Sequence, residues 1–149
     1  MKTALWAGLV LIVIVLLLVA LQIDDWSRDL TTNTAETDAR ASDPRLRPRE
    51  SSHESAELSR IIRQAVEKLP GWSFRAELVD RRRRTLQYVR KTRWLGFEDD
   101  VTVRIIDLGD RRRVHVASAS RVGRGDLGQN PRNIAELMTA LTVELDQAP

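Results

Sequence analysis

Hydrophobic and polar positions divide the chain into three stretches with different periods. Residues 4–23 are continuously apolar, residues 27–53 show almost no apolar periodicity, and residues 54–147 carry helix-like and strand-like repeats in turn. Changes of period along a chain separate regions that fold differently. The pattern predicts a transmembrane helix within 1–26, a flexible polar linker at 27–53 and one folded domain at 54–147.

The folded domain is predicted to contain two helices and four strands. Apolar residues recur every three or four positions over 54–69 and 134–145, which is typical of helices with one buried stripe. They alternate over 72–79, 84–91, 101–106 and 114–117, which is typical of strands. Short connections make consecutive strands antiparallel. We therefore expect an α+β fold, a four-strand antiparallel meander with both helices packed on one face.

The apolar stretch 4–23 has the length of a membrane span. Its twenty residues contain no charge, and as a helix they would rise about 30 Å, the thickness of a bilayer's hydrocarbon. Lys2 precedes the stretch, and Asp24 and Asp25 follow it. Positive charge favours the cytoplasmic side, so we expect a single-pass signal anchor with a cytoplasmic N-terminus and a periplasmic or otherwise extracytoplasmic domain. A cleaved signal peptide with a secreted domain is the alternative.

Composition limits the chemistry that is available. The chain has no cysteine, which excludes disulfides, thiolate metal ligands and a cysteine nucleophile. Its net charge of +3 suits partners that carry phosphate or carboxylate. Aromatic residues make up only 5% of the chain, which argues against nucleic acid as a partner.

A four-strand meander brings two loops together at one end of the sheet. The second connection, which contains "GFEDD", and the segment after the fourth strand, "SRVGRGDLGQN", share that end. The arginine runs at 81–84 and 111–113 share the other end with the start of the first domain helix, and so with the linker. We therefore expect Asp99 and Asp100 to lie within reach of Arg121, Arg124 and Arg132.

These two segments also carry a family resemblance. "TRWLGFEDDVTVRI" and "VHVASASRVGRGDLGQNPRNI" resemble the hallmark motifs of the family called domain of unknown function 1499, over residues 54–145. The resemblance implies membrane-associated or exported proteins without an assigned activity. The residues that match the motifs, with Arg132 beside them, are Phe97, Asp99, Asp100, Ser118, Ser120, Arg121, Gly123, Asp126, Gly128, Asn130 and Arg132.

The cluster at this end allows three interpretations. It only stabilises the loop if the glycines supply positive φ, Asn130 caps the second helix and Arg121 pairs with Asp99 or Asp100. It is an anion pocket for phosphate, sulfate or carboxylate if free N–H groups of the turn and helix start act with the arginines. Three carboxylates, from Asp99, Asp100 and Asp126, would suit calcium or magnesium. The neighbouring arginines argue against a cation, and we expect no metal or cofactor.

The two arginine runs allow two further interpretations. Such runs are often solvated turns that discourage edge pairing, and the alternative is contact with anionic lipid headgroups. The residues concerned are Arg81, Arg82, Arg83, Arg84, Arg111, Arg112 and Arg113.

The sequence favours a membrane-anchored, non-enzymatic binding or scaffolding module. Its expected partners are the lipid bilayer through residues 4–23, anionic headgroups and an envelope protein. The alternative is a hydrolase or other enzyme that uses Asp99, Asp100 and Arg121. Ser118 and Ser120 have no histidine that the pattern places nearby, because His115 should point to the open face of the sheet.

Overall fold

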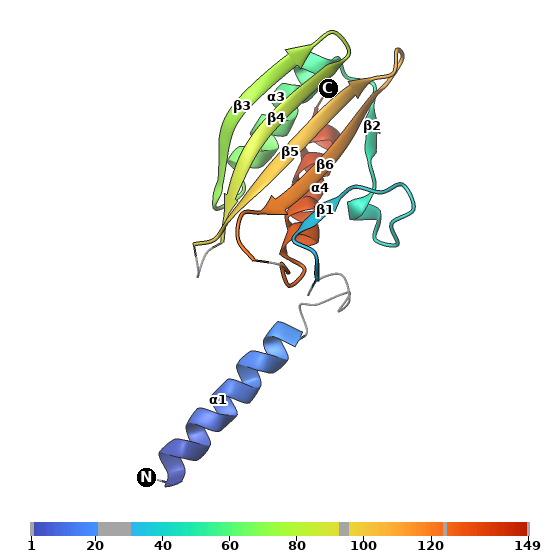
Figure 1. Cartoon of the computed structure of the whole chain (residues 1–149). Helices are drawn as coiled ribbons and strands as arrows, with labels where there is room; N and C mark the ends of the chain where they lie inside the picture. The colour runs from blue at the N-terminus through green and yellow to red at the C-terminus, as the bar shows by residue number, and fades with distance from the viewer. Residues whose placement is uncertain (1, 21–30, 93–95, 124, 149) are drawn as a thin grey trace.

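The computed structural model describes residues 2–20, 31–92, 96–123 and 125–148, which form three α-helices, a 3-10 helix and six strands. Figure 1 shows their arrangement. In chain order the elements are α1 (Lys2–Ala20), β1 (Thr34–Glu36), η1 (Pro44–Leu46), β2 (Arg49–Ser51), α3 (Ser55–Glu67), β3 (Trp72–Asp80), β4 (Arg83–Lys91), β5 (Glu98–Asp107), β6 (Arg112–Ser120) and α4 (Gln129–Gln147).

The six strands form one antiparallel sheet in the order β1-β6-β5-β4-β3, and β2 also pairs with β6. The prediction of a four-strand sheet is therefore wrong. The two additional strands come from residues that we assigned to the flexible linker. Thr34–Glu36 pair with Ala119–Ala117, and Arg49–Ser51 pair with Val114–Arg112. Both short strands satisfy backbone groups that would otherwise be unpaired along the edge of β6.

The segment 31–53 runs along the whole of β6 before α3 begins. Asn33 lies beside the far end of β6, where its carbonyl accepts a hydrogen bond from the Ser120 N–H at 2.9 Å. Glu54, directly before α3, bonds Arg112 at the other end at 2.6 Å. The arginine runs thus share an end with the start of α3, as the meander predicts. The linker does reach that end at Ser51, but it starts beside Ser120 at the opposite end and pairs along β6 on the way.

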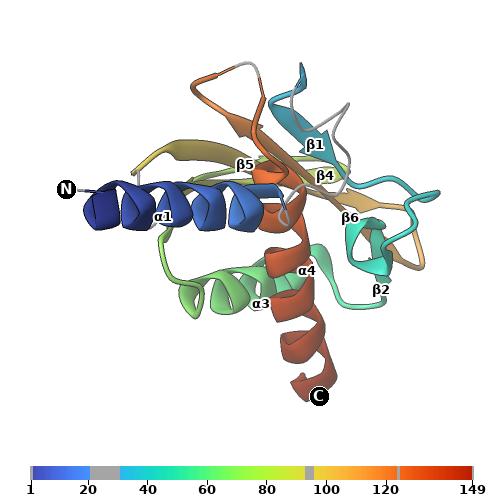
Figure 2. The ribbon, with the colours of Figure 1, turned by 90° about the horizontal axis from the view of Figure 1, so that it is seen from below.

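Helices α3 and α4 pack side by side on one face of the sheet, as Figure 2 shows from below. The core between helices and sheet is apolar and fully buried, and each large side chain contributes about 1.5–3 kcal/mol by its burial. Its largest members include Leu58, Ile61, Ile62, Leu86, Tyr88, Val103, Ile105, Ile134, Leu137 and Leu141. None of the described helices covers the opposite face of the sheet (Figure 1).

Gly71 sets the path from α3 into β3. Its φ is +81°, and a Cβ at this position would lie 2.7 Å from the Lys91 carbonyl oxygen. The Lys91 N–H donates to the Gly71 carbonyl at 2.8 Å. Only glycine allows both the left-handed backbone and this close approach, so the Pro70-Gly71 pair ends the helix and starts the sheet in register.

Helix α1 differs from the predicted membrane anchor. It has 19 residues and ends at Ala20. In the described ranges, no helix has the combined length and apolar character that crossing a membrane requires. This finding contradicts the predicted single-pass signal anchor and the membrane location and orientation that depend on it. Residues 21–26, with Asp24 and Asp25, lie outside the described residues.

Candidate functional site

Asp99 and Asp100 lie on opposite faces of the sheet. They are consecutive residues of β5, and side chains alternate along a strand. Asp99 faces the helices and is 2% exposed, whereas the Asp100 side chain is 53% exposed on the open face. The two carboxylates cannot converge on one substrate or cation. This geometry does not support the predicted hydrolase or a calcium site that uses both residues.

Asp99 belongs to a buried hydrogen-bond network that joins the sheet to α4. The Asn133 side-chain amide donates to Asp99 Oδ2 at 2.8 Å and to Ser118 Oγ at 3.1 Å. Ser118 Oγ in turn donates to Asn130 Oδ1 at 2.6 Å. Ser118, Asn130 and Asn133 are all at most 1% exposed. Buried polar groups are tolerated because each finds a partner, so the network fixes how α4 sits on β5 and β6.

Asn130 extends this network to the start of the domain. Its amide nitrogen donates to the Asn33 carbonyl at 2.7 Å and to Ser120 Oγ at 3.0 Å. Asn130 is the second residue of α4, and Gly128 occupies the N-cap position. The prediction that Asn130 caps the helix is therefore wrong, because its side chain points into the protein instead of back to the helix start.

Asp126 supplies the negative charge at the start of α4. Its two carboxylate oxygens accept hydrogen bonds from the N–H groups of Gly128 and Asn130, both at 2.9 Å. Its carbonyl accepts the Gln129 N–H at 3.0 Å. Carboxylates at this position bond free N–H groups and complement the helix dipole. The N–H groups that an external anion would use are thus bonded within the chain, and anion binding at the turn stays a prediction.

Arg121 ties the two loops together on the open face. Its Nε and Nη2 donate to Asp100 at 3.0 and 2.6 Å, and its Nη1 contacts Glu98. The Arg121 N–H also donates to the Glu98 carbonyl at 3.2 Å. The hydrogen bond from Arg121 lowers the pKa of Asp100, and the same bond raises the pKa of Arg121. Arg121 therefore pairs with Asp100 and Glu98, and Asp99 is held by Asn133 instead.

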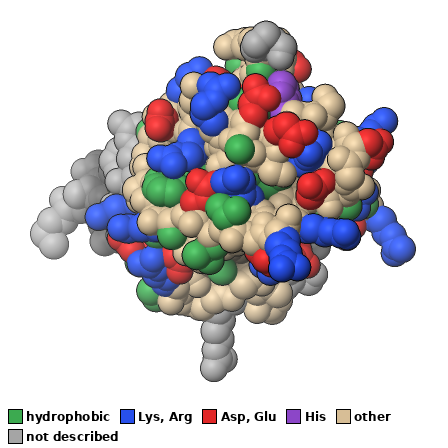
Figure 3. All heavy atoms as spheres, turned by 90° about the horizontal axis from the view of Figure 1, so that it is seen from above, with side chains coloured by type: hydrophobic (Ala, Val, Ile, Leu, Met, Phe, Trp, Pro, Cys, Tyr) green, Lys and Arg blue, Asp and Glu red, His purple; other side chains and the backbone are tan. Residues whose placement is uncertain are grey.

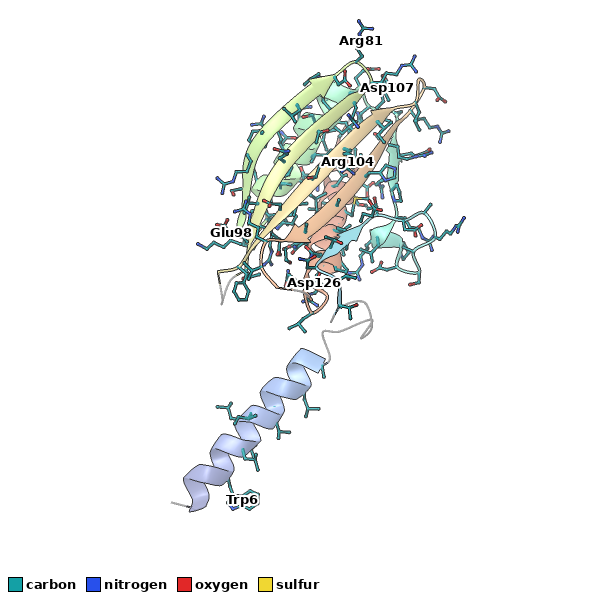
Figure 4. All side chains as sticks on the ribbon, in the orientation of Figure 1. Trp6, Arg81, Glu98, Arg104, Asp107 and Asp126 are labelled. Carbon is teal, nitrogen blue, oxygen red and sulfur yellow. The ribbon has the colours of Figure 1, made fainter. Side chains whose placement is uncertain are left out.

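Gly123 and Arg132, two further residues of the predicted site, lie near the Arg121–Asp100 ion pair in the chain. Gly123 has a φ of 97° and its carbonyl accepts a hydrogen bond from Asn33 Nδ2 at 3.1 Å. Arg132 Nη2 donates to Gln129 Oε1 at 3.4 Å, and Arg124 lies outside the described residues. We call the end of the sheet formed by residues 96–98, 121–123 and 125–128 the loop end. Glu98 and Asp126 mark it in Figure 4, opposite Arg81.

The loop end also exposes apolar side chains that the sequence analysis did not single out. Val122 is 69% exposed and Leu127 is 41% exposed, and Phe97, which was predicted, is 51% exposed. Phe97 and Val122 flank the backbone bond between Glu98 and Arg121. The sequence does contain a signal for Val122 and Leu127. A run rich in glycine and arginine is typical of a surface loop, so large apolar residues within it are expected to be exposed.

The side chains that would support metal or nucleophilic chemistry are dispersed. Across the described ranges, no group of three or more His, Cys, Asp and Glu side chains is placed to hold a metal ion. His115 lies in β6 with Nδ1 3.3 Å from Thr37 Oγ1, and burial, followed by the charge of Arg113, lowers its pKa. The buried Ser118 lies three residues along the same strand and thus faces the opposite side.

The arginine runs are largely ion-paired. Arg112 is only 8% exposed and bonds Glu54 at 2.6 Å, while Arg113 bonds Glu50 and Arg84 bonds Glu77, both at 2.7 Å. Figure 3 shows basic and acidic side chains interleaved at this end. Arg81, Arg82 and Arg83 are exposed. Contact of the runs with anionic headgroups stays a prediction.

Comparison with known proteins identifies the family. The family described as "Protein of unknown function (DUF1499)" matches residues 25–141, which is more than half of the chain, so the protein belongs to this family. The resemblance seen in the sequence is confirmed. The match begins well before residue 54 and so includes β1 and β2. No curated protein matches the chain.

Proposed function

We propose that this member of the DUF1499 family is a non-enzymatic binding module that recognises another protein through the loop end. The observation that carries the proposal is the exposure of Phe97, Val122 and Leu127 on two adjoining loops. Exposed apolar groups are costly in water and, when gathered and surrounded by polar residues, are typical of protein-binding surfaces.

The loops that carry these side chains are held in place by the rest of the domain. Arg121 joins the two loops through Asp100 and Glu98, and Asn33 holds the Gly123 carbonyl. Asp126 bonds the backbone that follows Leu127. A surface whose conformation is already fixed loses little entropy on binding, which supports recognition by these loops.

The charges around the apolar side chains resemble the rim of a protein interface. Glu98, Asp100 and Arg121 are each between 35% and 53% exposed and carry both signs of charge. Partly exposed charges of both signs contribute to specificity and to the rate of association.

The enzymatic alternative has weaker geometric support. The two carboxylates that it needs face opposite sides of β5, and Asp99 is buried. The Ser118 hydroxyl is buried and bonded to two asparagines. Neither group is placed to meet a substrate together with Arg121.

Site-specific photo-cross-linking tests the proposed recognition surface. The photoreactive residue benzoylphenylalanine replaces Phe97 in the full chain, within cells that make the protein naturally. We expect one discrete cross-linked species that contains a second protein. The same species should disappear when Val122 and Leu127 are made polar in the same chain.

The control places benzoylphenylalanine at Leu78, which is 59% exposed in β3 and away from the loop end. The absence of a discrete product from position 97, or an identical product from both positions, would contradict recognition through the loop end.

A further inference from the structure

A groove follows the outer side of α4. It consists of two adjoining cavities of about 580 and 500 Å³ that share Arg45 and Thr139 in their walls. Along α4 the walls extend from Gln129 to Val143, a rise of about 21 Å. We call this feature the α4 groove. Its other walls are η1, the segment up to β2, the end of α3 and Arg90 of β4.

The charge of the α4 groove is strongly positive. The basic residues in its walls are Arg45, Arg47, Arg49, Arg90 and Arg132, and the acidic residues are Glu50 and Glu136. Glu50 has its partner outside the groove, whereas Glu136 also forms an ion pair with Arg90 inside it. Glu50 accepts hydrogen bonds from Arg113 at 2.7 and 3.1 Å, and Glu136 accepts one from the Trp72 indole at 3.1 Å.

Arg47 and Arg49 bond neutral acceptors, which leaves their positive charges without a bonded carboxylate in the contacts described. Arg47 Nε donates to the Ala41 carbonyl at 2.7 Å, and Arg49 Nη1 donates to Thr142 Oγ1 at 3.0 Å. The buried Arg90 Nε has no hydrogen-bond partner among the described residues and lies 3.8 Å from Glu136. Arg45 differs because it forms an ion pair with Asp43 at 2.8 Å.

The walls between the arginines are apolar. Leu69 and Ala135 lie in one cavity, and Pro44, Met138 and Val143 lie in the other. A phosphate ion would use the arginines but leave these surfaces in water. A chain that carries both carboxylates and apolar side chains would use both features.

We propose that the α4 groove binds an extended, acidic peptide segment of a partner protein. About six residues at roughly 3.3 Å each would fill its length. Acidic side chains of the segment pair with Arg47 and Arg49, and its apolar side chains cover the neighbouring apolar walls. This site is separate from the loop end, and neither proposal depends on the other.

Fluorescence anisotropy with the full chain tests this proposal. The probe is a fluorescein-labelled hexapeptide, Glu-Leu-Asp-Glu-Leu-Asp, and its neutral match is Gln-Leu-Asn-Gln-Leu-Asn. The groove variant carries Arg47→Gln and Arg49→Gln, the two wall arginines that bond neutral acceptors. The control variant carries Arg81→Gln and Arg82→Gln, which remove the same charge from exposed positions in the turn between β3 and β4 that do not line the groove.

We expect the groove variant to bind the acidic probe about tenfold more weakly than the native chain. The control variant should bind within about twofold of the native chain, because it keeps every arginine of the groove although its net charge falls by the same amount. Thermal unfolding of both variants shows whether each is folded. Because the two variants have the same net charge, any difference between their affinities comes from the position of the arginines.

Three results would overturn the proposal. An equal loss of affinity for the acidic peptide in both variants would indicate attraction by net charge alone. Equally tight binding of the neutral and acidic peptides to the native chain would show that the arginines do not contribute to recognition. Tighter binding of a single-stranded oligonucleotide with the same number of charges would assign the groove to nucleic acid.

Discussion

Asp99 and Asp100 show how one residue of offset in a strand separates two roles. Asp99 anchors α4 through Asn133 in the interior, and Asp100 anchors Arg121 on the surface. A buried hydrogen bond and an exposed ion pair differ in energy. Leaving one partner of a buried bond unsatisfied costs about 1–3 kcal/mol, whereas an exposed ion pair contributes about 0–1 kcal/mol.

Replacing Asn133 tests the buried role. Asn133→Ala removes donors to Asp99 and Ser118, so we expect the free energy of unfolding to fall by about 1–3 kcal/mol in urea denaturation. Val143→Ala is the control on the same helix, because Val143 is 47% exposed. Equal losses in the two variants would show that the network contributes nothing beyond helix packing.

His115 gives a testable pH dependence. Burial and Arg113 lower its pKa below the ordinary value of 6.5, and Arg104 and Glu36 also face it. The unfolded chain therefore takes up the proton first as pH falls. Neutral His115 therefore contributes to the stability of the fold. This contribution is fully present above the ordinary pKa and is lost as the pH falls through the lower pKa of the folded chain. We expect His115→Gln to reduce the decline in unfolding midpoint between about pH 7.5 and pH 5. If the unfolding midpoint of the variant declines as much as that of the native chain, the pH dependence comes from other titratable groups.

At the scale of elements, the edge of β6 shows what the sequence could not reveal. Periodicity predicted helices where α3 and α4 lie and strands where β3 to β6 lie. It could not predict β1 and β2, because each has only three residues and alternation needs about four to be recognised. Polar residues suit these strands because an edge strand is half exposed. The sequence therefore indicated the wrong number of strands and the wrong path for the linker.

Removing β1 and β2 tests their structural role. A fragment of residues 31–149 should unfold cooperatively, whereas a fragment of residues 54–149 should unfold at a lower temperature and self-associate. The shorter fragment exposes the β6 edge. It also loses the bond that Asn33 donates to the Gly123 carbonyl and the bond that its own carbonyl accepts from Asn130. Circular dichroism and light scattering measure both effects. Equal unfolding temperatures for the two fragments would show that residues 31–53 add nothing to the stability of the domain.

At the scale of the whole molecule, the two ends of the sheet have different chemistry. The arginine runs are mostly paired with acidic residues and with β2, and the loop end exposes apolar side chains beside the point where residue 31 joins the domain. The sequence correctly grouped the hallmark residues at one end. It could not show that Ser118, Asn130 and Asp126 bond within the protein, because that depends on strand register and on the exact start of α4.

The loop end combines an internal hydrogen-bonded framework with the exposed apolar side chains that we propose as a recognition surface. The most direct test measures both properties in one variant, Val122→Ser with Leu127→Asn. Asparagine suits position 127 because φ there is 52°. The account predicts that the free energy of unfolding changes by less than about 0.5 kcal/mol while the cross-link from position 97 is lost. A marked loss of stability with an intact cross-link would contradict it.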